Sequence, residues 1–259
     1  MKRIIIFGAA LLLAIGSASA WGLVGHRIVV ELAKRHMTEQ TKKNVAKYMP
    51  YDIVKDAVWM DQHRKDKPLR HTHHWHSFRY DNQKRYDINP SAKRGDVVRA
   101  IDIADFNLAR YKELSDSAVV MNLRMLIHFV ADMHCPSHAD PLWKKWGKKV
   151  HFRGKTYNDF HYIYDIMPEW LYGRGNGAEF KAAEALDTYS KGKRKKVCKG
   201  TVRDWADETA RLTYITYEWN PVEGNMREDT VEISKEMTDT QMQNAGYRLA
   251  FLLNKYFGK

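Results

Sequence analysis

Apolar residues recur at helical spacing along most of this 259-residue chain, which predicts a mainly all-α protein. The pattern predicts helices over residues 21–36, 38–49, 51–63, 96–114, 115–133, 160–171, 178–189, 201–219 and 229–257. One β-hairpin is predicted over residues 150–157, with Gly154 at its turn. Because no repeat, low-complexity stretch or linker separates these elements, we expect a single multi-helix domain.

Two segments carry further predictions, one about a helix that packs on the core and one about a basic surface loop. Asp96 suits the N-cap of the helix over 96–114, in which Ile103 and Phe106 are expected to point inward with the other apolar residues. Residues 191–199, which read KGKRKKVCK, have no apolar period and predict a basic loop. Such a loop is either a solvated surface or a contact for nucleic acid.

The first 20 residues have the pattern of a signal peptide. Lys2 and Arg3 precede an apolar run over residues 4–15, and Ala18 and Ala20 suit a cleavage site. The run is shorter than the roughly 20 residues of a membrane span, although an uncleaved anchor is the alternative. We therefore expect an exported, periplasmic or secreted, domain over residues 21–259 that has no stable membrane association.

Charge and cysteine content add two open questions. The formal net charge of +12 favours polyanionic partners, nucleic acid above all, or it serves solubility alone. Cys135 and Cys198 are the two cysteines. In an oxidising compartment they could form a disulfide, remain free thiols, or supply a thiolate ligand through Cys135.

The central stretch over residues 123–138, LRMLIHFVADMHCPSH, combines an apolar helix with ionisable side chains. His128 and Asp132 are four apart and share one helical face. Burying both groups is unfavourable unless something compensates them, and a divalent metal does so with imidazole and carboxylate ligands. A buried His–Asp pair without metal is the alternative.

Further histidines and aspartates accompany apolar segments elsewhere in the chain. The full candidate set is His26, Asp61, His76, His128, Asp132, His138, His161 and Asp165. This set exceeds what one zinc ion binds, so convergence would give two or three ions, an arrangement suited to phosphoryl transfer. The α-amine and carbonyl of Trp21 become a further candidate after signal cleavage. The alternative is a set of hydrogen-bonded core histidines.

Several ordered motifs together resemble the S1/P1 nuclease family. They are WGxxGH (21–26), WxDxxR (59–64), WH (75–76), HFxxDxHxPxH (128–138), HxxxD (161–165), WADETA (205–210) and AGYRLAFLLN (245–254). The resemblance covers essentially the whole mature chain. It implies the helical fold that these nucleases share with zinc phospholipase C, and a monomeric, zinc-dependent endonuclease and 3′-nucleotidase for single-stranded DNA and RNA.

The resemblance also implies three zinc ions per chain and assigns their ligands. One ion would take Asp61, His76, His128 and Asp132; a second Trp21, His26 and the bridging Asp132; a third His138, His161 and Asp165. Arg64 would contact the scissile phosphate, Asp61 would orient the attacking water, and the products would carry 5′-phosphates. His134 matches no ligand position and is expected near the ligands or on the surface.

The sequence departs from the fungal members where they stack a base. Ser77 stands in the aromatic position, Arg79 replaces an acidic residue, and Tyr164 replaces a tryptophan between the ligands of the HxxxD motif. Stacking is therefore expected from other aromatic residues, namely Phe78, Tyr80, Trp143 or Trp146. The fungal cysteine pairing has no counterpart here.

Two other functions remain open at this point. A phospholipase C-type lipid phosphodiesterase would use the same ligands, although no apolar docking segment is evident in the sequence. A non-catalytic protein that sequesters metal or binds nucleic acid would lack turnover.

Overall fold

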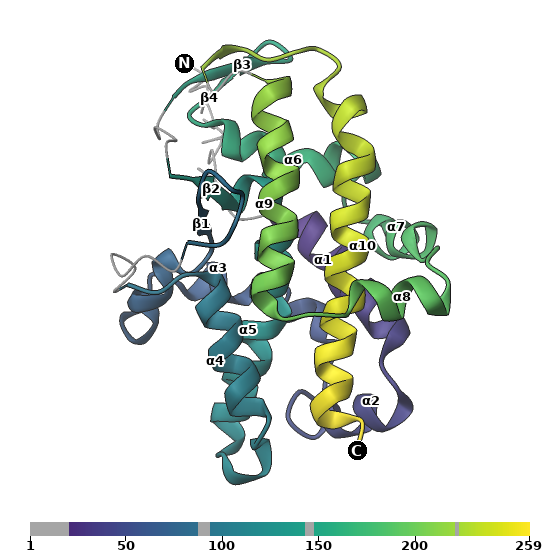
Figure 1. Cartoon of the computed structure of the whole chain (residues 1–259). Coiled ribbons are helices and arrows are strands. Elements are labelled where there is room, and N and C mark those ends of the chain that lie inside the picture. Colours follow the sequence, from purple (N-terminus) through teal and green to yellow (C-terminus); the bar gives the residue numbers. More distant parts are fainter. Residues whose placement is uncertain (1–20, 88–93, 143–147, 221–222) are drawn as a thin grey trace, which may run out of the picture.

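The computed structural model describes residues 21–87, 94–142, 148–220 and 223–259 (Figure 1). The predicted signal peptide, Trp143 and Trp146 lie outside these residues. Helices dominate, so the prediction of a mainly all-α fold is confirmed. Among the described residues, we find no helix with the length and apolar character needed to cross a membrane.

The helices and strands follow the predicted order with few exceptions. The α-helices are α1 Gly22–His36, α2 Glu39–Ala46, α3 Trp59–His63, α4 Val97–Leu108, α5 Asp116–His134, α6 Phe160–Tyr172, α7 Ala178–Leu186, α8 Lys191–Val197, α9 Val202–Trp219 and α10 Thr230–Phe257. Short 3₁₀ helices cover Ile53–Asp56, Lys67–His74, Tyr111–Glu113 and Pro136–His138. The strands are β1 Phe78–Tyr80, β2 Ala139–Pro141, β3 Val150–Phe152, β4 Lys155–Tyr157 and β5 Gly224–Asn225.

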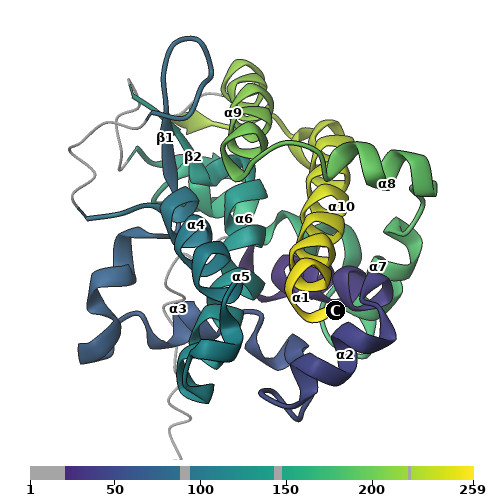
Figure 2. The ribbon, with the colours of Figure 1, turned by 60° about the horizontal axis from the view of Figure 1, so that its bottom comes forward.

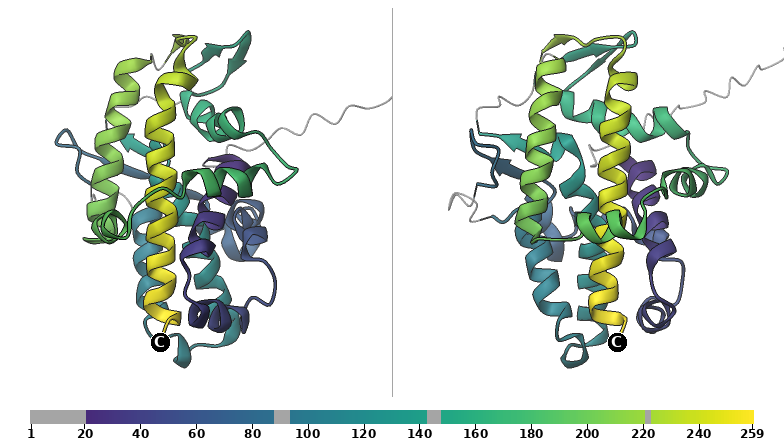
Figure 3. Two further views of the ribbon diagram at one scale, coloured as in Figure 1. Left: turned by 90° about the vertical axis from the view of Figure 1, so that its right-hand side faces the viewer. Right: turned by 45° about the vertical axis from the view of Figure 1, so that its right-hand side comes forward.

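The long helix α10 and the central helix α5 organise the core. α10 packs against α1, α2 and α5, while α4 lies along α5 and α9 closes the same side (Figures 1 and 2). Figure 3 shows α10 running nearly the full height of the molecule, with α1 and α2 beside its C-terminal half. Every residue of α5 from Met125 to His134 is buried, so polar groups in that stretch face the protein interior.

Side-chain caps explain where several helices begin. Ser115 accepts from the Ala118 amide at the start of α5, and Asp159 accepts from the His161 amide at the start of α6. These oxygens satisfy amides that the first helical turn leaves unpaired. The α5 chain then becomes extended at Cys135, directly before Pro136.

Three predicted elements differ in the structure. Residues 51–63 form a 3₁₀ turn and the short α3 instead of one helix, because Asp52 accepts from the Val54 amide and Val58 leaves the helical region at φ −117°. Residues 191–197 form the helix α8, which Ser190 caps, instead of a loop. Ile103 and Phe106 are 43% and 62% exposed, since α4 turns its other face toward α5.

One of the two small sheets positions two histidines of the candidate site. β3 and β4 form the predicted antiparallel hairpin. β1 pairs in parallel with β2, with Phe78 opposite Ala139, a contact that the sequence did not predict. His76 and His138 each precede one of these strands, so the pairing brings the two histidines together.

Candidate metal centre and active site

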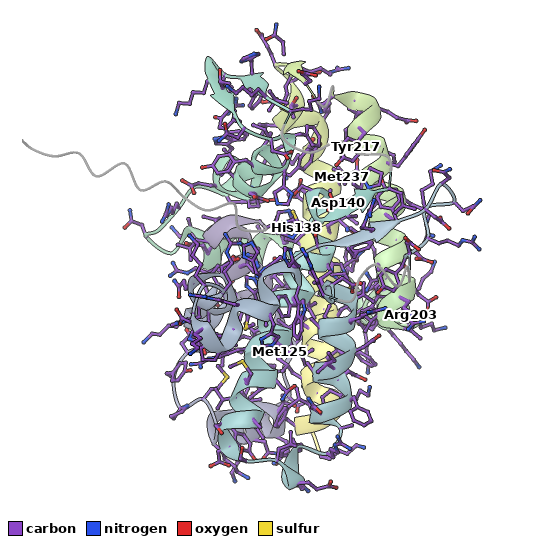
Figure 4. All side chains as sticks on the ribbon, turned by 90° about the vertical axis from the view of Figure 1, so that its left-hand side faces the viewer. Met125, His138, Asp140, Arg203, Tyr217 and Met237 are labelled. Atoms are coloured by element: carbon purple, nitrogen blue, oxygen red, sulfur yellow. The ribbon has the colours of Figure 1, made fainter. Side chains whose placement is uncertain are left out.

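The candidate donors meet where α1 begins, α5 ends and α6 begins, with α3 and the β1–β2 pair beside them. In Figure 4, Met125 marks the middle of α5, and His138 lies above it, beyond the C-terminal end of that helix. All eight candidate histidines and aspartates are brought into this region, which is the convergence that the sequence left open.

Asp132 lies at the centre of the first set of donors. Its Oδ1 lies 3.1 Å from His26 Nε2, and its Oδ2 lies 2.9 Å from His76 Nδ1 and 3.1 Å from His128 Nε2. The His26 and His128 rings stack at 4.4 Å between centroids. The two carboxylate oxygens of Asp132 therefore face different histidines, as a bridging ligand requires.

Asp61 and Arg64 border this set from α3 and the residue that follows it. Asp61 lies 3.4 Å from His76 Nδ1 and 3.7 Å from His128 Nε2 through its two oxygens. Arg64 Nη1 lies 3.4 Å from Asp61 Oδ1. The Ala57 carbonyl lies 2.9 Å from His128 Nδ1, which leaves Nε2 of that ring directed at the acidic side chains.

His138, His161 and Asp165 form a second set. Asp165 Oδ1 lies 3.8 Å from His138 Nε2, and its Oδ2 lies 3.5 Å from His161 Nε2. His138 Nδ1 contacts the His76 carbonyl and lies 3.9 Å from Asp132 Oδ1, so this set adjoins the first. Ser137 donates to Asp165 Oδ1 at 3.4 Å.

Trp21 directly precedes a close contact between the start of α1 and Asp165, and two glycines make this packing possible. A Cβ on Gly25 would lie 2.6 Å from the Trp21 Cβ, and one on Gly22 would lie 3.1 Å from the Asp165 carbonyl oxygen. Gly22 also has φ +27°, which other residues rarely adopt. The Trp21 side chain is fully buried. Gly22, the residue after Trp21, is thus packed against the Asp165 backbone.

Burial and charge oppose each other in this site. Burial lowers the pKa of His128, but Asp132 and Asp61 raise it to about 9. Burial raises the pKa of Asp132, but His128 and the neighbouring histidines hold it well below its usual range. Burial, together with the charges of Asp61 and Asp132, raises the pKa of Asp165 well above its usual range. Cations would stabilise these buried carboxylates.

The donor geometry fits metal ions. Ligands about 2.1 Å from a tetrahedral zinc lie roughly 3.4 Å apart, close to most of the distances above. Three groups bring their donor atoms within 4.8 Å of one another: His26, His128 and Asp132; Asp61, His76 and His128; and Cys135, His138 and Asp165. His138 Nε2, which faces Asp165, is buried without a hydrogen-bond partner among the described residues, as an open ligand position would be.

The structure bears on the three roles that the sequence left open for the cysteines, namely a disulfide, free thiols and a metal ligand. Cys135 and Cys198 are both free thiols. Cys135 is buried and lies 3.2 Å from Ser137 Oγ, and burial raises the pKa of its thiol. A disulfide between the two cysteines is therefore absent, and burial favours the protonated form of the Cys135 thiol.

His134 is buried and belongs to the support of the site. Its Nδ1 lies 2.7 Å from the Val130 carbonyl, and its Nε2 accepts from Arg248 Nη1 at 2.8 Å. Arg248, fully buried in α10, also donates to the Val197 carbonyl and pairs with Glu208. One signal in the sequence could have indicated this role, namely a lone arginine in the apolar run AGYRLAFLLN.

The expectation for base stacking needs correction. Phe78 and Tyr80 are buried because their positions in β1 alternate into the core, so neither ring is available to a nucleobase. Arg79, between them, is exposed and donates to the Leu142 carbonyl at 3.1 Å. The other two candidates, Trp143 and Trp146, lie outside the described residues.

The fold and the site define a helical protein with converging groups of buried histidine and acidic donors that could hold metal ions. A family model described as S1/P1 Nuclease matches residues 21–258. Endonuclease 2 of Arabidopsis thaliana is 25% identical over 289 aligned positions, which cover 96% of this chain and 94% of the relative. Endonuclease 4 of the same plant is 28% identical over 171 positions, which cover 59% of this chain and 56% of the relative.

The chain therefore belongs to the S1/P1 nuclease family, as its motifs indicated. It is a nuclease, and hence a hydrolase of ester bonds, whose substrates are nucleic acids.

Proposed function

We propose that this protein is a zinc-dependent endonuclease and 3′-nucleotidase that hydrolyses single-stranded DNA and RNA to products with 5′-phosphates. The observation that carries the proposal is the position of Asp132, whose two oxygens face His26 on one side and His76 with His128 on the other. A carboxylate shared in this way suits two adjacent cations, and the group of His138, His161 and Asp165 suits a third.

The proposed ligands are those that the motifs assign: Trp21, His26, Asp61, His76, His128, Asp132, His138, His161 and Asp165. Bound zinc ions would acidify a water molecule and neutralise charge that develops on the phosphate. Zinc is preferred over calcium or magnesium because imidazole nitrogens make up half or more of the side-chain donors in each set.

The chain's own side chains have two further roles in this proposal. Asp61 would accept a hydrogen bond from the attacking water and orient it toward the phosphorus. Arg64, held 3.4 Å from Asp61, would present its guanidinium to the non-bridging phosphate oxygens. A side-chain nucleophile is unnecessary, so Cys135 has no catalytic role in this proposal.

We also propose that the protein is exported, that cleavage after Ala20 creates Trp21 as the N-terminus, and that the mature protein acts as a monomer. The start of the family match at residue 21 supports the processing site. The burial of Trp21, together with the contact between the adjacent Gly22 and the Asp165 carbonyl, supports its use as a ligand.

The test is zinc content of the signal-cleaved protein, together with hydrolysis of denatured DNA before and after chelation and after zinc is restored. Three zinc ions per chain and cleavage that follows zinc occupancy are expected. Phosphatidylcholine is the comparison substrate. Hydrolysis of the lipid without cleavage of DNA would refute the substrate assignment, and full activity without zinc would refute the metal assignment.

A further inference from the structure

A groove with a basic edge lies between α8 and the C-terminal half of α10. Its volume is about 550 Å³. Arg194, Lys195 and Lys199 line one side, and Ala250 and Phe251 line the other. None of these residues belongs to the candidate metal centre.

The basic residues on the α8 side of this groove have no ion-pair partner in the described part of the chain, and the carboxylate at its opposite edge, Asp187, is bound to His36 and Arg35. Six of the nine residues from Lys191 to Lys199 are lysine or arginine. In the part of the chain that the structure describes, no carboxylate lies within 4.0 Å of their nitrogens in an ion pair, whereas Arg35 on nearby α1 pairs with Asp187 at 2.9 Å. Basic side chains on a solvated surface usually alternate with acidic ones, and here they do not.

Local contacts hold part of this basic segment in place. Arg194 donates to the Tyr189 carbonyl at 2.9 Å, and Lys193 Nζ lies 3.5 Å from the centroid of the Tyr189 ring. Ser190 caps α8 through the Lys193 amide. The helix therefore presents its charges from a fixed backbone, which lowers the entropy lost when a ligand binds.

An exposed aromatic ring completes the groove. Phe251 is 44% exposed although the α10 residues on both sides of it are buried. Its ring lies edge-on to that of Trp205, at 6.5 Å between centroids, and nearly half of the residue stays accessible. Cations along a groove with an exposed aromatic ring form the usual combination for binding a single strand.

We propose that this groove binds a segment of single-stranded nucleic acid away from the metal centre, with phosphates on Lys195 and Lys199 and a base against Phe251. The proposal rests on the proposed function, because the bound strand is the substrate itself. An anionic membrane fits less well, since the surface is a groove and exposes one large apolar side chain rather than an apolar face.

The position of the groove gives the proposal a distinctive consequence. α8 lies on the right of the molecule in Figure 1, whereas β1, β2 and α3, which flank the metal centre, lie on the left, and Figure 2 agrees. A long strand is expected to reach both places, whereas a dinucleotide at the metal centre would leave the groove empty. Attachment at the groove would raise the local concentration of the strand at the metal centre only for long substrates.

The test compares two double variants, Lys195→Gln with Lys199→Gln and, as the matched control, Lys43→Gln in α2 with Lys47→Gln directly after it. Both pairs remove two exposed lysines that are four residues apart. A second comparison uses Phe251→Ala against Phe106→Ala, since both rings are exposed. The substrates are a 40-nucleotide thymidine strand and a thymidine dinucleotide, each measured over a range of salt concentrations.

We expect the groove pair to raise KM for the long strand by roughly ten-fold at low salt. Its salt slope should fall by about 1.4, because each contact with a single-strand phosphate contributes about 0.7. The kcat for the long strand and the kcat/KM for the dinucleotide should not change. Phe251→Ala should raise the same KM, and both controls should leave it unchanged.

Several outcomes would overturn the proposal. An unchanged KM of the groove pair for the long strand would do so, as would an equal change in its KM for the dinucleotide or an equal change in the control pair. Binding to phosphatidylglycerol vesicles is measured alongside. If the groove pair loses vesicle binding but keeps its binding of the strand, the groove binds an anionic membrane instead. If the unsubstituted protein cleaves neither substrate, the proposed function fails. Fluorescence anisotropy with the same uncleaved 40-nucleotide strand then tests whether the groove binds nucleic acid. Weaker binding by the groove pair than by the control pair supports the proposal, and equal binding refutes it.

Discussion

Asp132→Ala should remove two metal ions from the protein, not one. The reason is geometric, because Oδ1 of Asp132 faces His26 while Oδ2 faces His76 and His128, all within 3.1 Å. The substitution therefore takes a ligand from two neighbouring ions at once. His26→Ala, in contrast, takes a side-chain ligand from a single group and should lower the metal content by one.

The magnitude follows from what metal ligands contribute. Loss of a group that merely supports a ligand lowers metal affinity by about 10- to 100-fold, and loss of a direct ligand should reach at least the upper value. A 100-fold change corresponds to about 2.8 kcal/mol per ion, or roughly 5.6 kcal/mol for the two ions that share Asp132. At micromolar protein, both ions should be lost during gel filtration.

The assay is elemental analysis of zinc per chain after gel filtration in zinc-free buffer, with circular dichroism to verify that the helices persist. Asp132→Asn serves as a second variant, because it preserves the shape of the side chain and removes the charge. A loss of a single ion from Asp132→Ala, with the helical signal intact, would refute the bridging assignment. Loss of two ions from His26→Ala would also contradict it.

Three further predictions test other parts of the structure. The first is a chain produced without the signal but with a retained initiator Met before Trp21, which should contain one zinc ion fewer and lose most activity. Elemental analysis and a nuclease assay measure both effects. Full activity would exclude the Trp21 amine as a ligand. Arg248→Met leaves the buried His134 Nε2 without its hydrogen-bond donor. The unfolding free energy should therefore fall by about 2–5 kcal/mol and Tm by roughly 5–15 °C. A Tm within about 1 °C of the original would exclude a stabilising role for the Arg248–His134 hydrogen bond. Burial raises the pKa of Asp187, but hydrogen bonds from Arg35 and its other partners lower this pKa below 3.8 in the folded protein. The ionised carboxylate therefore stabilises the fold above pH 3.8, the unfolded value. This stabilisation is lost as the pH falls through the lower folded pKa. The difference in urea stability between the unsubstituted protein and Asp187→Asn, both free of metal, should therefore shrink as the pH falls below about 4. A constant difference would show that this carboxylate does not act through its charge.

The sequence predicted the helices whose apolar period is strong and whose caps are explicit. Ser115 and Asp159 begin α5 and α6 as side-chain caps do, and both helices extend as their periodicity indicated. Where the period was weak, tertiary contacts decided the structure. The segment before α3 breaks into a 3₁₀ turn, and Phe106 faces solvent because another face of α4 packs on α5.

The site was predictable as a set of residues, and its arrangement was not. The spacing of four between His128 and Asp132 places both on one helical face, which needs only helical geometry. The approach of His76 to His138 depends on the parallel pairing of β1 with β2, two strands of three residues with no periodic signal in the sequence. Arg248 escaped prediction for a related reason, since its partners lie on α5, α9 and the end of α8.

The wide separation of the donors along the chain bears on how the protein folds. His26 and Asp132 are 106 residues apart, and His76 and Asp132 are 56 apart, so loops of this length must close before either contact exists. An unfolded chain offers no preformed site, and a cation bound by the native arrangement therefore shifts the folding equilibrium. An ion present at a thousand times its dissociation constant adds about 4 kcal/mol to the unfolding free energy. For such a protein, thermal stability becomes a measure of the free metal concentration in its surroundings.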